Sequence, residues 1–104
     1  MKLQELIQSV KEKNLSKDQL EDYRDQMSQL FAEMMIEISE LEKEEAIFMN
    51  ETWNNHDGSE MSVAGKKVKW KATQSGQRLI VLKRYTLATK EMLNSLKSRL
   101  YSIY

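Results

Sequence analysis

The chain contains no cysteine and no proline, and only three glycines interrupt its 104 residues. Without cysteine it has no disulfide, no thiol nucleophile and no cysteine-based zinc or iron–sulfur site, which is compatible with a reducing compartment. Without proline, little stops a helix, and 31% charged beside 40% hydrophobic residues suits long helices. Because a chain of this length is about one domain, we expect a single all-α domain over residues 1–104.

Long apolar runs are also lacking. No stretch approaches the roughly 20 apolar residues that span a bilayer. The first residues, MKLQELIQSVKEK, are interrupted by charged and amide side chains, so they lack the continuous apolar segment of a signal peptide. We therefore expect no membrane partner and a cytoplasmic location.

Apolar spacing predicts where the first helices begin. A short helix over residues 2–13 is indicated by apolar residues three and four positions apart: Leu3, Leu6, Ile7 and Val10. Ser16 and Gln19 have the spacing of a capping box, and Leu15 and Leu20 have that of a hydrophobic staple. These signals predict a second helix that begins at Lys17.

Two long helices are predicted to form the main seam of the protein. The helix over residues 17–54 carries a near-heptad stripe with one four-residue slip: Leu20, Tyr23, Met27, Leu30, Met34, Ile38 and Leu41. The helix over residues 74–104, capped by Thr73 or Ser75, repeats that spacing: Leu82, Tyr85, Thr89, Met92, Leu96, Leu100 and Ile103. Matching periods predict that these helices pack as an antiparallel, coiled-coil-like hairpin.

Residues 55–72 are predicted to connect the two long helices. Turn-favouring residues run from Asn54 to Ser59, so the chain is expected to reverse there. Apolar residues then alternate on either side of Gly65, which indicates a small β-hairpin or, alternatively, an ordered loop: Met61, Val63, Val68 and Trp70. A connection of this length is a candidate for function or for disorder.

Several apolar residues lie outside the two stripes and need cover. They are Phe31, Met35, Ile36, Ile47, Phe48, Trp53, Leu79, Ile80, Val81, Leu87 and Leu93. Because a two-helix hairpin buries only one stripe of each helix, we expect a homo-oligomer.

Charge is strongly segregated, although the net charge is zero. Residues 1–62 contain 15 acidic and 6 basic residues, whereas residues 63–104 contain one acidic and 10 basic residues. One interpretation is that the acidic and basic helices neutralise each other. An acidic cluster could instead bind a basic partner: Glu37, Glu40, Glu42, Glu44 and Glu45.

Four lysines surround Trp70 in GKKVKWKATQSGQRLIVLKRY, a stretch without any acidic residue. Lysines neutralise phosphates and an exposed indole stacks on an unpaired base, which together suit single-stranded DNA. The alternative is a solvated lysine turn whose Trp70 folds back onto the protein. The candidate nucleic-acid-binding residues are Lys66, Lys67, Lys69, Trp70, Lys71, Arg78, Lys83, Arg84, Lys97 and Arg99.

Catalytic residues in a recognisable pattern are absent. His56 is the sole histidine and lies in a polar turn, and no phosphate-binding glycine loop or serine elbow is present. Paired glutamates would need Glu-x-x-His partners to hold two metals, and the chain has none. We expect no enzyme activity and no cofactor or metal.

Segments WKAT, GQRL and MLNSLKSRL, from Trp70, Gly76 and Met92 onward, resemble short proteins of tailed phages. In layout the chain is similar to the UvsY family of recombination mediators. The resemblance implies a homo-oligomer that binds single-stranded DNA and helps to load a recombinase, with Lys97 and Arg99 of the Leu-Lys-x-Arg-Leu element on the DNA. Two other hypotheses compete with this one. The protein could inhibit a host defence protein by contact in the host cytoplasm, or it could be a structural coiled-coil assembly factor.

Overall fold

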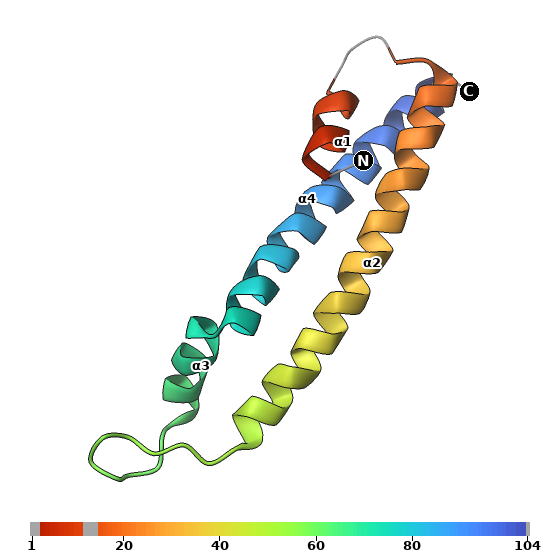
Figure 1. Ribbon diagram of the computed structural model, residues 1–104. Coiled ribbons are helices and arrows are strands. Elements are labelled where there is room, and N and C mark those ends of the chain that lie inside the picture. The colour runs from red at the N-terminus through yellow and green to blue at the C-terminus, as the bar shows by residue number, and fades with distance from the viewer. Residues whose placement is uncertain (1–2, 12–14, 104) are drawn as a thin grey trace. The chain divides into compact units, whose positions relative to one another are not determined.

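The computed structural model describes residues 3–11 and 15–103, and these residues are all-α. They form the helices α1 (Leu3–Val10), α2 (Lys17–Asn50), α3 (Val63–Ala72) and α4 (Gln74–Ile103), drawn in Figure 1. The chain divides into two compact units: Met1–Met35 with Arg84–Tyr104, and Ile36–Lys83. The expected all-α class is confirmed.

An apolar core that α1, α2 and α4 share holds the first unit together. Its buried residues are Leu6, Val10, Leu20, Met27, Leu96 and Leu100, with Ile7, Leu15, Tyr23, Leu30, Met92 and Leu93 packed against them. The start of α2 therefore packs against the end of α4, which is the antiparallel pairing that their common period predicts. Figure 1 shows α1 beside that same end of α4.

The start of α2 is the capping box that the sequence predicts. The Ser16 backbone N–H donates to Gln19 Oε1 at 2.9 Å, and the Gln19 N–H donates to Ser16 Oγ at 3.2 Å. Leu15 and Leu20 both join the core, as a hydrophobic staple requires. The predicted helix over residues 2–13 is α1, although residues 2, 12 and 13 lie outside the described part of the chain.

In the second unit, α2 ends at Asn50 and not at Asn54 as predicted. Two side chains satisfy carbonyl groups of its last turn. The Trp53 indole N–H donates to the Phe48 carbonyl at 3.2 Å, and Lys66 Nζ donates to the Met49 carbonyl at 3.2 Å. Because a helix C-terminus carries partial negative charge, the ammonium group stabilises this end.

The chain reverses after α2 at the turn that the sequence predicts. Asn54 and Glu60 form one isolated antiparallel bridge, and Gly58 between them has φ 83°. That left-handed conformation favours glycine. Asp57 Oδ1 accepts from the Ser59 backbone N–H at 3.0 Å and from its hydroxyl at 2.5 Å, which fixes the turn.

The largest departure from prediction lies in residues 63–72, which form α3 rather than a loop or β-hairpin. No residue of the described ranges belongs to a strand. Ser62 caps α3, because its Oγ accepts from the Gly65 N–H at 3.1 Å. The lysines that follow are good helix formers, and Trp70 is the one buried side chain of α3.

Thr73 joins α3 to α4. Its hydroxyl donates to the Trp70 carbonyl at 2.6 Å and accepts from the Gly76 N–H at 2.9 Å. One threonine thus closes α3 and caps α4, so of the two predicted caps, Thr73 and Ser75, Thr73 is confirmed. The buried Gly76 lies directly against the last turn of α3, so the junction leaves no room for a side chain there.

The two predicted stripes mostly face inward. Of the residues in them, Leu20, Met27, Ile38, Leu41, Leu82, Thr89, Leu96 and Leu100 are buried, and Tyr23, Leu30, Met34 and Met92 are half-buried. Tyr85 is 40% exposed and departs from the prediction. The side chain of Ile103, like residue 104, lies outside the described part.

Replacing Gly76 by alanine tests the junction between α3 and α4. The added Cβ would lie 2.8 Å from the Trp70 carbonyl carbon and closer still to its oxygen. Because backbone cannot give way as a flexible side chain does, we expect Gly76→Ala to lower the free energy of unfolding by about 1–3 kcal/mol. Urea denaturation followed by circular dichroism measures it. Ser75→Ala, one residue away, is the control and should change little; equal stability of both variants would contradict the geometry.

Candidate nucleic-acid interface

Trp70 is buried, with only 5% of its surface exposed. Its ring centroid lies 5.5 Å from that of Phe48, and Phe48 in turn lies 4.9 Å from Trp53. An indole held in this aromatic cluster is not available to stack on a base. The hypothesis of an exposed Trp70 is therefore wrong. The alternative is right in that Trp70 folds back onto the protein, but the lysines around it lie on the helix α3 and not in a turn.

The lysines around Trp70 do not form one free patch. Lys66 caps α2 as described above, and Lys69 Nζ lies 3.9 Å from the centroid of the Trp53 ring. Such cation–π contacts contribute about 0.5–1 kcal/mol at exposed sites. Lys67 and Lys71 are exposed on α3. Two of the four predicted lysines thus act within the second unit.

Arg78 is also engaged within the second unit. Its Nε donates to Glu37 Oε2 at 2.7 Å and its Nη2 donates to Glu37 Oε1 at 3.2 Å, a two-pronged ion pair. The hydrogen bond from Arg78 lowers the pKa of Glu37 below its ordinary value of 4.5. One member of the acidic cluster therefore pairs with a predicted DNA contact.

Arg99 of the Leu-Lys-x-Arg-Leu element contacts the C-terminal end of α1. Its guanidinium donates to the backbone carbonyl of Val10, the last residue of that helix. A cation at a helix C-terminus is stabilising for the same reason as at α2. Lys83 and Arg84 are exposed on α4. The predicted DNA contacts are therefore spread over both units rather than gathered at Trp70.

Charge is nearly balanced inside each unit. The first unit contains nine basic and eight acidic residues, and the second contains seven basic and eight acidic residues. The acidic and basic halves of the sequence are thus both represented in each unit, and neither unit carries a large net charge. This supports the interpretation that acidic and basic segments neutralise each other.

Lys97 has different surroundings from the other predicted residues. In the first unit it lines two hollows, of about 310 Å³ and about 210 Å³, that share Arg24 and Lys97. We call them together the basic groove. Its walls are Arg24, Ser28 and Phe31 from α2, and Lys90, Leu93, Asn94, Lys97, Leu100 and Tyr101 from α4.

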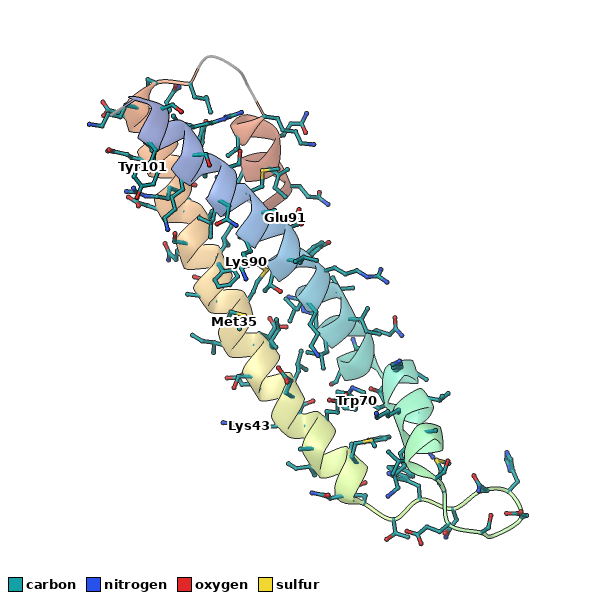
Figure 2. The ribbon with its side chains drawn as sticks, turned by 180° about the vertical axis from the view of Figure 1, so that it is seen from behind. Met35, Lys43, Trp70, Lys90, Glu91 and Tyr101 are labelled. Atoms are coloured by element: carbon teal, nitrogen blue, oxygen red, sulfur yellow. The ribbon has the colours of Figure 1, made fainter. Side chains whose placement is uncertain are left out.

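The composition of the basic groove is one-sided. Among the described residues that line it, three are cations and none is acidic. Arg24 forms an exposed ion pair with Asp25 at 3.3 Å, whereas Lys90 and Lys97 make no hydrogen bond or ion pair to any residue that the structure describes. Tyr101 is 74% exposed at one end. In Figure 2, Lys90 and Tyr101 project from one side of α4 and Glu91 from the other.

Helical spacing brings these residues to one face. Positions 90, 94, 97 and 101 of α4 are separated by four, three and four residues, and positions 24, 28 and 31 of α2 by four and three. The sequence prediction included Lys97 but missed Arg24, Lys90 and Tyr101. The signal that could have identified these three residues is the recurrence of basic and aromatic residues at this spacing on the exposed face of each helix.

The described residues form no cluster of candidate catalytic or metal-binding side chains. His56 is exposed in the turn, with no partner among the described residues. Within residues 3–11 and 15–103, no group of three or more histidine, aspartate or glutamate residues lies close enough to hold a metal ion. No helix in the same ranges is long and apolar enough to cross a bilayer.

Stability at low pH tests the pair between Glu37 and Arg78. Because the folded state lowers the pKa of Glu37, the pair stabilises the protein above about pH 4.5, and this contribution is lost as the pH falls through the lowered pKa. Both side chains are about half exposed, so solvent screens the pair and the effect is below about 1 kcal/mol. We expect Glu37→Gln to reduce the loss of stability between neutral and acid pH, measured by urea denaturation. Glu42→Gln, at an exposed carboxylate outside any described ion pair, is the control; identical pH profiles for both variants would exclude the pair.

No protein-family model, curated protein or solved structure matches this chain. The likeness to recombination mediators therefore rests on the motifs quoted above. Among the residues of that likeness, the structure separates Lys97, which faces the basic groove, from Arg99, which caps α1.

Proposed function

We propose that the protein binds single-stranded DNA through the basic groove and acts as an accessory protein rather than as an enzyme. The observation that carries the proposal is the groove itself: its described lining holds three cations and no acidic residue, with an exposed aromatic ring at one end. This moves the site of the predicted activity from Trp70 to Tyr101.

Each part of the groove suits an unpaired strand. Arg24, Lys90 and Lys97 neutralise phosphates, which requires no particular base sequence. The Tyr101 ring offers an exposed face on which a base can stack. Ser28 and Asn94 supply polar groups between the cations, and hydrogen bonds from such groups position a nucleotide.

The mediator role extends this proposal. Lys97 belongs to the Leu-Lys-x-Arg-Leu element that resembles the recombination mediators, and it faces the basic groove. A helical protein that holds a strand in this way, as a homo-oligomer, would help a recombinase to load. That step, with recombination proteins as partners, is part of the proposal.

Contact with another protein is the second candidate function. It is favoured by apolar side chains that stay exposed: Met35, Ile36, Ile47, Val63, Val68 and Leu87. An inhibitor of a host defence protein or a coiled-coil assembly factor would use such surfaces in place of the basic groove. Binding to a strand by the isolated protein separates these functions.

Titration with a fluorescent oligothymidine at two salt concentrations tests the proposal. Each phosphate that the protein neutralises releases counterions from the strand. For single-stranded DNA, the plot of log binding constant against log salt concentration therefore has a slope of about −0.7 per neutralised phosphate. We expect Lys90→Ala with Lys97→Ala to weaken binding and to reduce the slope by about 1.4. Tyr101→Ala should cost about 1–3 kcal/mol of binding free energy, and Tyr101→Phe, which keeps the ring, should cost little.

The matched control removes the same charge from elsewhere. Lys67→Ala with Lys71→Ala takes two exposed lysines from α3 and leaves the basic groove intact. We expect it to bind nearly as the native chain does. Binding that is lost equally in both double variants would show a diffuse charge effect, and the absence of binding by the native chain would favour the protein-contact functions.

A further inference from the structure

One face of α2 in the second unit is exposed along three turns. Ile36 is 62% exposed and Ile47 is 64% exposed, and Glu40 and Lys43 lie between them, also exposed. Steps of four, three and four residues place all four side chains on one side of the helix. Figure 2 shows Lys43 pointing outward, away from α3.

The order of residues on this face is self-complementary. Read in either direction, an isoleucine stands at each end with one acidic and one basic residue between them. When two copies of α2 lie antiparallel, centred between Glu40 and Lys43, Ile36 meets Ile47 of the second copy and Glu40 meets Lys43 of the second copy. Two-fold symmetry repeats both pairs, which is the requirement for an isologous interface.

We propose that a second copy of this chain docks on the face formed by Ile36, Glu40, Lys43 and Ile47, with the two α2 helices antiparallel. The complementary charges of Glu40 and Lys43 are the reason for choosing a second copy of this chain as the partner. Lys43 is the only lysine or arginine between Arg24 and Lys66, and in the register that also pairs Ile36 with Ile47 it stands opposite Glu40 of the second copy. Neither Glu40 nor Lys43 has a hydrogen bond or ion pair among the described residues.

The same charges exclude a parallel pair. In that arrangement Glu40 would meet Glu40 and Lys43 would meet Lys43, which is destabilising at close range. The antiparallel contact spans about 17 Å of helix, at 1.5 Å per residue. Because a face of this length falls short of the roughly 800 Å² per partner of a standard interface, the dimer is weak and depends on concentration.

Charge reversal tests the pairing. In Glu40→Lys homodimers lysine opposes lysine, and in Lys43→Glu homodimers glutamate opposes glutamate, so each variant should raise the dimer dissociation constant about tenfold or more. An equimolar mixture of the two variants restores opposite charges at both pairs and should dimerise again. The double variant Glu40→Lys with Lys43→Glu should also dimerise. Sedimentation equilibrium at low salt over a range of concentrations measures all four.

The control is Glu42→Lys, which changes the charge equally on another face of α2. It should dimerise as the native chain does, and circular dichroism confirms that each variant is folded. The proposal is overturned if the native chain stays monomeric at every concentration, if the single reversals leave the dissociation constant unchanged, or if the mixture and the double variant both stay monomeric. None of these variants alters the basic groove, so the result is independent of strand binding.

Discussion

The contact of Trp70 with Phe48 is the interaction on which the second unit depends. It joins α3 to the end of α2, and Trp53 and Lys69 complete the cluster around it. Because Trp70 is the one buried side chain of α3, it supplies the apolar burial of this helix, while Lys66 and Lys69 add polar and cation–π contacts. The same contact removes the aromatic ring that the basic stretch would need to stack on DNA.

Basic residues in this chain hold helices together as much as they supply a surface. Lys66 satisfies a carbonyl at the end of α2, and Arg99 does so at the end of α1. Arg78 pairs with Glu37 in the second unit. Each of these cations has its own structural task, so a count of lysines and arginines overstates the charge that is free to bind a polyanion.

The helices and the seams could be predicted because they follow from periodicity and from local capping. The Ser16 and Gln19 box and the Thr73 cap need only neighbouring residues. The helix α3 could not be predicted in this way, since only one of its apolar side chains, Trp70, is buried, and the partner of Trp70, Phe48, lies 22 positions earlier. The basic groove likewise joins residues of α2 and α4 that are distant in sequence. Of its three cations, only Lys97 belongs to a sequence motif, the Leu-Lys-x-Arg-Leu element.

A two-dimensional NMR titration of the full chain with unlabelled oligothymidine tests most directly the claim that Trp70 is structural and the basic groove binds the strand. We expect shifts in the backbone amides of residues 24–31 and 90–101, with the indole signals of Trp53 and Trp70 unmoved. Largest shifts in the two indoles and in residues 63–72 would contradict it.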